Sequence, residues 1–228
     1  SYCGHLLLFD PDTLQNVSDS NTIFIHHFEN SITYNDPISG EVLFHTNGHK
    51  MYNRRYDVMF GGGSLIDYSD PYDMGMGFWA GILVLPRPGS TTDYQYIADA
   101  NPYVVSRIGD VYHAGIYAGK VDMTANSGLG RVYDRTLIVS DSTSLGNIIA
   151  TRHANGRDWW IVKPYRLLEG TYFRWLYTPV GLERQADLRM LPYHHTWQSA
   201  FRPDGSAFAL ATGYGSGSQD LEVHLMDF

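Results

Sequence analysis

The stretch IIATRHANGRDWWIVKPY, residues 148–165, contains two short apolar runs separated by a polar segment with Asn155 and Gly156. An Asn-Gly pair tolerates positive φ angles and forms tight turns between antiparallel strands. The runs on either side are rich in the branched and aromatic residues that strands favour. The stretch therefore predicts a β-hairpin, with strands at Asn147–His153 and Asp158–Tyr165.

The same plan recurs along the chain. Apolar residues come in runs of strand length separated by Gly, Asn, Asp and Pro, and helical periodicity is nearly absent. Further tight turns are predicted at residues 37–40 and 203–206. Each copy has a strand, a tight turn, a second strand, a looser turn and a third strand. The copies begin near Ser31, Gly81, Asn147 and Gln198, the second with a longer insertion.

The sequence predicts strands throughout the chain. They are expected at Thr22–Phe28, Ser31–Asn35, Glu41–Thr46, Lys50–Asn53, Gly81–Pro86, Asp93–Asp99, Val111–Ala118, Gly130–Leu137, Asn147–His153, Asp158–Tyr165, Tyr172–Thr178, Ala186–Met190, Gln198–Phe201, Ala207–Gly213 and Leu221–Phe228. A repeat of about 50 residues built from such strands is typical of propeller blades.

The expected fold is accordingly all-β, a β-propeller with blades of antiparallel strands. We expect a single domain over residues 1–228, with a lead-in at 1–29 and blades at 30–228. The copies amount to about four and a half blades, which falls between closed rings, so we expect an incomplete or partial ring from a longer chain.

Bulk composition excludes several classes of protein. A formal net charge of −8 without a basic run argues against nucleic-acid binding. No apolar stretch approaches the roughly 20 residues that span a bilayer, so no membrane span is expected. The single cysteine, Cys3, excludes a disulfide within the chain and a cysteine-rich zinc site. The chain begins without Met, as it would after removal of a signal peptide.

Five stretches, in order, carry a resemblance to a known family. They are ITYNDPISGEVLFHTNGHKMYNRR (32–55), GILVLPRPGSTTDYQYI (81–97), KVDMTANSGLGRVYDR (120–135), RHANGRDWWIV (152–162) and AFRPDGSAFAL (200–210). From about residue 30 to its end, the chain resembles the N-terminal β-propeller-like regions of very large exported Bacteroidota proteins. Those proteins often end in a gliding-motility-associated or type IX secretion sorting domain. The opening SYCGHLLLFDPD and the Gly-rich insertion at 60–77 depart from the family pattern.

The resemblance implies a secreted, extracellular or cell-surface setting. It implies a non-catalytic structural or adhesive module, part of a surface filament or of a gliding- or secretion-linked assembly. The partners it implies are other domains of the same long chain or other surface proteins. It implies no particular ligand, and carbohydrate binding is an alternative function.

The hairpin of residues 148–165 also carries a polar and aromatic cluster, whose members are Arg152, His153, Asn155, Arg157, Asp158, Trp159 and Trp160. One interpretation is a site that stacks a sugar and bonds its hydroxyl groups. The other is a structural clasp in which Asp158 pairs with Arg152 or Arg157 and accepts N–H groups of the turn. We favour the clasp, because polar residues in such turns commonly satisfy backbone groups. Neighbouring strand residues face opposite sides, so one tryptophan should lie in the core between blades and the other on the opposite face.

The Gly-rich insertion and the two residues that follow it hold the remaining ligand candidates. The candidate carbohydrate-stacking residues are the loop aromatics Tyr68, Tyr72, Phe78 and Trp79. Candidate calcium ligands are Asp67, Asp70 and Asp73, but their spacing does not fit a twelve-residue calcium loop, so a solvated acidic loop is preferred and no cofactor is expected.

Catalytic patterns are sparse, and we expect no enzyme activity. The pairs His26-His27 and His194-His195 are adjacent, so their side chains point apart on a strand. This disfavours a metal site at either pair and leaves a two-histidine site with distant carboxylates as the alternative. No GxSxG string is present, and Cys3 is a poor candidate nucleophile. A propeller glycoside hydrolase with paired carboxylates from different blades is the second alternative.

Overall fold

The computed structural model describes residues 6–10, 13–17, 31–67, 81–100, 103–105, 111–141, 143, 147–165, 170–189, 196–213 and 221–228. These residues form strands, turns and one short 3₁₀ segment, Asn126–Gly128, with no α-helix among them. The expectation of an all-β protein is confirmed. A search of this part of the chain finds no helix of the length and hydropathy that a bilayer crossing requires.

The strands of the first half are β1 (Leu6–Asp10), β2 (Thr13–Val17), β3 (Ile32–Asn35), β4 (Val42–Thr46), β5 (Met51–Asn53), β6 (Ile82–Pro86), β7 (Asp93–Asp99), β8 (Tyr103–Val105), β9 (Val111–His113) and β10 (Ile116–Asp122). Those of the second half are β11 (Arg131–Val139), β12 (Ile149–Arg152), β13 (Trp159–Pro164), β14 (Thr171–Thr178), β15 (Gly181–Arg184), β16 (Leu188–Arg189), β17 (Thr196–Phe201), β18 (Ala207–Gly213) and β19 (Leu221–Asp227).

Most strands belong to four antiparallel sheets that follow one another in the sequence. The first sheet is β3-β4-β5, the second β6-β7-β10-β11, the third β12-β13-β14-β15 with β16 on β14, and the fourth β17-β18-β19. Two hairpins, β1-β2 and β8-β9, stand outside these sheets. No sheet closes on itself within the described ranges.

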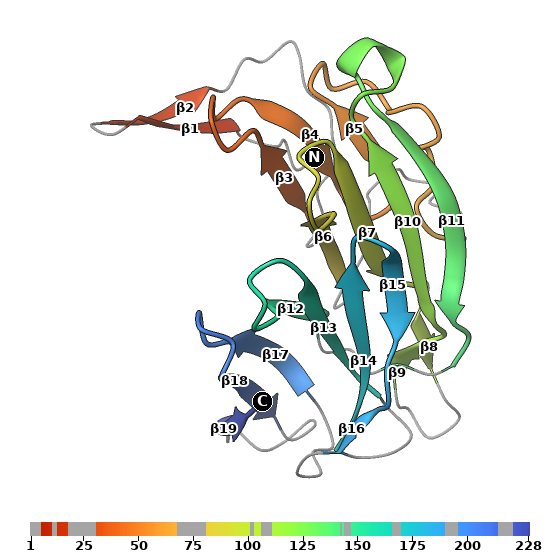
Figure 1. The fold of residues 1–228 in the computed structure, drawn as a ribbon, viewed down its shortest axis with the longest axis vertical. Coiled ribbons are helices and arrows are strands. Elements are labelled where there is room, and N and C mark those ends of the chain that lie inside the picture. The colour runs from red at the N-terminus through yellow and green to blue at the C-terminus, as the bar shows by residue number, and fades with distance from the viewer. Residues whose placement is uncertain are drawn as a thin grey trace.

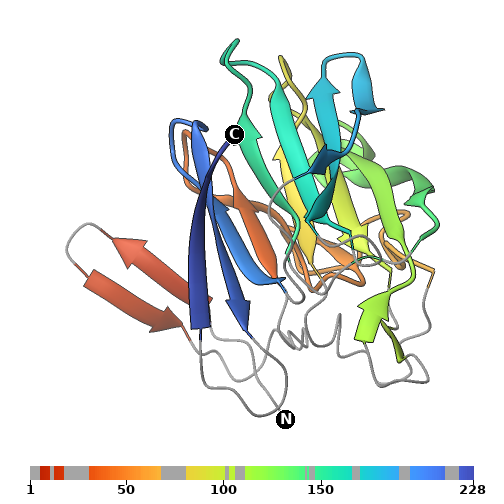
Figure 2. The ribbon, with the colours of Figure 1, turned by 90° about the horizontal axis from the view of Figure 1, so that it is seen from below.

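The four sheets are arranged around an open curve. Figure 1 shows the first strand of each sheet, β3, β6, β12 and β17, toward the inner side of this curve. Strand β3 contacts β6, and β12 contacts β17. The β1-β2 hairpin projects away from the sheets in both views (Figures 1 and 2). The inner strands of the first and second sheets, and those of the third and fourth, are therefore neighbours although they lie far apart in the sequence.

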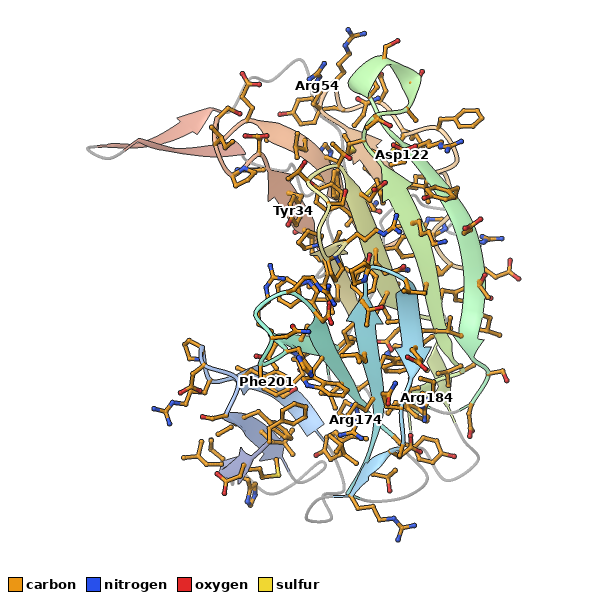
Figure 3. The ribbon with its side chains drawn as sticks, in the orientation of Figure 1. Tyr34, Arg54, Asp122, Arg174, Arg184 and Phe201 are labelled. Atoms are coloured by element: carbon orange, nitrogen blue, oxygen red, sulfur yellow. The ribbon has the colours of Figure 1, made fainter. Side chains whose placement is uncertain are left out.

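Three apolar cores lie between successive sheets, because strand residues alternate between two faces. On β7, Tyr94 and Tyr96 face the core shared with the first sheet, whereas Ile97 faces the core shared with the third. The third core joins the last two sheets, where Phe208 of β18 packs against Phe201 at 5.5 Å (Figure 3). The two middle sheets are thus covered on both faces, which explains their nearly continuous apolar strands.

Predicted and observed strands differ at a few places. The predicted strand Val111–Ala118 is two strands, β9 and β10, separated by a bend at Ala114. At the adjacent Gly115 a Cβ atom would lie 2.3 Å from the Val139 carbonyl oxygen. Strands β1, β2, β8 and β15 were not expected, and β16 is shorter than the predicted Ala186–Met190. The predicted strand Thr22–Phe28 lies outside the described residues.

Candidate functional site

The turn between β12 and β13 is closed by its own backbone and by Asn155. The amide of His153 donates to the Asp158 carbonyl oxygen at 2.9 Å, and the amide of Gly156 donates to the His153 carbonyl oxygen at 2.8 Å. Gly156 has a φ of 70°, which glycine adopts without strain. The Asn155 side-chain oxygen accepts from the amides of Arg157 and Asp158, both at 3.0 Å.

The Asp158 carboxylate is enclosed by the same turn and is 4% exposed. Its Oδ1 accepts from Arg157 Nε at 2.8 Å, and its Oδ2 accepts from Arg157 Nη2 at 3.1 Å and Asn155 Nδ2 at 2.7 Å. The hydrogen bond from Arg157 is the main reason that the pKa of Asp158 lies below its ordinary value, and the same bond raises the pKa of Arg157. Both carboxylate oxygens are therefore engaged within the turn.

The structure decides one alternative that the sequence left open in this cluster and corrects one expectation. Asp158 pairs with Arg157 and not with Arg152, and the acceptor of the turn amides is Asn155. Arg152 instead donates from Nη1 to the Arg157 carbonyl oxygen at 2.7 Å, while its guanidinium lies 3.7 Å from the Trp159 ring centroid. Arg157 is thus the ion-pair partner of Asp158, and Arg152 covers the Trp159 ring.

The two tryptophans lie on opposite faces of β13, as strand alternation predicts. Trp159 packs against the core between the second and third sheets, and its Nε1 donates to the Pro86 carbonyl oxygen at 3.2 Å. The ring centroid of Trp160 lies 5.5 Å from that of His153, and the Arg174 guanidinium lies over the Trp160 ring at 5.0 Å. Arginine covers a face of each indole, so this cluster is built as a clasp.

The clasp predicts a pH-dependent contribution to stability. The folded-state pKa of Asp158 is lowered, so its stabilisation is full above the unfolded value of about 4 and is lost as the pH falls through the folded value. Asp158→Asn is expected to lower the melting temperature at pH 7 and to have a smaller effect at pH 3, below the unfolded pKa. Differential scanning calorimetry of the variant and wild type at both pH values measures this. An equal difference at both pH values would contradict the assigned role of the carboxylate.

The clasp has counterparts in the other three sheets. Each turn between the first and second strands is closed by an amide bonded to the far side of the turn, and each contains a glycine with positive φ. These glycines are Gly40, Gly89, Gly156 and Gly205, with φ of 74°, 81°, 70° and 73°. In two turns an aspartate caps amides: Asp36 accepts from Ile38 and Ser39, and Asp204 accepts from Ser206. The amide of Ser39 is the main cause of a lowered pKa at Asp36. At Asp204 the main cause is the Ser206 hydroxyl, which donates to Oδ1 at 2.7 Å, followed by the Ser206 amide.

A buried ion pair links the second and third sheets. Lys163 of β13 lies 2.8 Å from Asp99 Oδ2 of β7, and both side chains are 0% exposed. The same oxygen accepts from the Gly81 amide at 2.6 Å. Burial lowers the pKa of Lys163, and the nearby carboxylate opposes that change. The pair is therefore a polar cross-link between the two sheets that is sealed from solvent.

A second polar cross-link joins the third and fourth sheets. The Asn147 side-chain oxygen accepts from the amide of Ser199 at 2.8 Å and from its hydroxyl at 2.9 Å, and Asn147 Nδ2 donates to the Ser199 carbonyl oxygen at 3.1 Å. Neither cross-link was expected from the sequence. The available signal was a charged residue inside an apolar run, Lys163 after WWIV and Asp99 after YQYIA.

Most remaining candidates lie outside the described residues: Tyr68, Tyr72, Phe78, Trp79, Asp70, Asp73, Cys3 and the two histidine pairs. Asp67 is described and exposed. Within the described ranges, no group of three His, Cys, Asp or Glu side chains is arranged to hold a metal ion. The carbohydrate and calcium hypotheses therefore stay predictions from the sequence.

The fold defines the chain as an all-β protein built from four successive antiparallel sheets with recurring turns. No protein-family model, curated protein or solved structure matches it.

Proposed function

We propose that the four sheets are blades of a β-propeller-type module. Three features support this: the sheets follow the sequence order, their first strands lie on the inner side of one curve, and apolar cores fill the spaces between them. The recurring glycine turns also argue for one repeated unit. Repetition of small antiparallel sheets around a centre is the arrangement that defines propellers.

As a function, we propose a non-catalytic structural or adhesive module of a secreted cell-surface protein. The observation that carries the non-catalytic part is the clasp, whose charged groups are bonded to one another, with Asp158 engaged through both carboxylate oxygens. The buried Asp99–Lys163 pair is likewise sealed between sheets. The surface setting rests on the sequence resemblance. Polar groups that are bonded within a turn or buried between sheets favour a rigid scaffold over a reactive site.

Protease treatment of intact producing cells tests the surface setting. An immunoblot for residues 31–228 should lose its signal when intact cells are treated, while a cytoplasmic marker persists. Retention of the signal until the cells are lysed would contradict the proposal. A panel of chromogenic glycosides tests the non-catalytic part with the purified chain, and reproducible turnover of any of them would overturn it.

A further inference from the structure

Among the described residues, the outer strands of the four sheets differ in how much of the outer edge stays open. Tyr52 of β5 bridges to Val58, and Arg131 of β11 bridges to Phe60. Strand β5 has three residues and β15 has four. Strand β11 is longer, but its pairing with β10 shifts register twice, and Asp134 has a φ of 54°. Strand β19 pairs with β18 over seven residues without a shift, and it contains no Lys, Arg or Pro. Short or bulged edges resist further pairing, so β19 presents the most regular edge of the four.

The hydrogen-bonding groups on that edge follow from one bond. The amide of Phe228 donates to the Ser206 carbonyl oxygen of the neighbouring strand at 3.0 Å. Bonding alternates along an antiparallel strand, so every second residue counted back from Phe228 bonds to β18. The backbone groups of the other residues point to the open edge. These residues are Leu221, Val223, Leu225 and Asp227.

Two apolar side chains stand exposed beside this edge. Val223 is 61% exposed and Leu225 is 80% exposed, and both lie on one face of the fourth sheet. On the neighbouring strand β18, the residue opposite Val223 is Ala211 and the residue opposite Leu225 is Ala209. Small neighbours leave the larger side chains uncovered, and a further strand next to β19 would bring side chains alongside them.

We propose that β19 pairs with β19 of a second copy of this chain, in antiparallel orientation, about a two-fold axis at His224. In this register Val223 lies opposite Leu225 of the second copy, and Leu225 lies opposite Val223. The outward-pointing backbone groups then meet in hydrogen-bonded pairs, and His224 forms the central pair without hydrogen bonds. The fourth sheets of the two copies become one continuous six-stranded sheet.

The strand is self-complementary in this register. All seven residues find a partner, whereas a shift by two residues leaves two residues of each strand unpaired. The two acidic residues, Glu222 and Asp227, fall opposite Met226 and Leu221, so no like charges stand directly across from each other. Each apolar pair occurs twice by symmetry, as in isologous dimers. These features favour a second copy over an unrelated strand, and the inference does not depend on the proposed surface function.

Sedimentation equilibrium over a range of concentrations tests the association. The wild-type chain should move toward twice its mass as concentration rises. Leu225→Lys should weaken association about tenfold or more, because it places a charged side chain in each of the two symmetry-related Val223–Leu225 pairs. Val223→Pro should abolish it, since proline removes an outward-pointing amide and spares the bonds to β18. Val180→Lys is the control. Val180 is 98% exposed and lies in the turn between β14 and β15, away from β19, so this variant should associate like wild type.

Cysteine cross-linking tests the register in a Cys3→Ser background. His224→Cys should form a disulfide-linked dimer under mild oxidation, because opposed residues of a non-hydrogen-bonded pair lie about 4.5 Å apart at Cα. Glu222→Cys should not, because four strand residues separate the two copies of that position, more than about 13 Å. A monomer at every concentration, a dimer that survives Val223→Pro, or equal linking of both cysteine variants would overturn the proposal.

Discussion

Replacing Lys163 with alanine is expected to lower the free energy of unfolding by about 3–5 kcal/mol, the usual cost of breaking a fully buried ion pair. The substitution leaves the Asp99 carboxylate buried without the ammonium group that lies 2.8 Å from it. It also removes a side chain from the interface of two sheets, where no solvent reaches. Urea denaturation followed by tryptophan fluorescence at pH 7 measures the change.

A matched pair of variants separates lost charge pairing from lost packing. Lys163→Met keeps most of the side-chain volume but leaves Asp99 buried without its ion-pair partner, so it should be nearly as destabilising as Lys163→Ala. Combining Lys163→Met with Asp99→Asn removes both charges and keeps a side-chain oxygen for the Gly81 amide, so it should recover part of the stability. A double variant less stable than Lys163→Met alone would contradict this account.

Trp175→Ala is expected to cost about 3–5 kcal/mol, the range measured for truncating buried aromatic residues. Trp175 lies on β14, is 2% exposed, and belongs to the core between the second and third sheets. Its ring centroid lies 6.0 Å from that of Phe173, and the Arg184 guanidinium covers it at 5.1 Å (Figure 3). Truncation leaves a cavity that the surrounding strands cannot fill without losing register.

The size of that cavity can be graded by substitution. Trp175→Phe keeps an aromatic ring in the core and should cost clearly less than Trp175→Ala when unfolding is followed by far-ultraviolet circular dichroism. Val180→Ala, at the exposed turn after the same strand, should leave the unfolding midpoint unchanged. If the alanine variant at 175 unfolds like wild type, the second core is not packed as described.

Strand positions and turns were largely predictable because they depend on neighbours in the sequence. Strands β7 and β18 begin and end where the pattern predicted, and the turn at Asn155 and Gly156 has the expected backbone. The all-β class follows from the same signals. Prediction was weakest for strands that contain no apolar run. One example is β15 (Gly181–Arg184), which is a strand because it pairs with β14.

The candidate site divides in the same way. The sequence predicted that Trp159 and Trp160 face opposite sides, because alternation is a property of the strand itself. It left the partner of Asp158 open between two arginines, since both lie within a few residues of it. The structure decides for Arg157, because Arg152 is held over the Trp159 ring.

By itself, the sequence determined the hairpins, the alternation of their faces and the glycine turns, since these depend on φ and ψ preferences and on residues only a few positions apart. Only the tertiary structure decided which sheets meet. Asp99 and Lys163 are 64 positions apart, and Asn147 and Ser199 are 52 apart. These pairings follow from how the sheets stack after they form, and the local pattern of apolar residues does not predict them. The exposure of Val223 and Leu225 is likewise set by what packs on the fourth sheet, so the open edge of β19 became visible only in the folded chain.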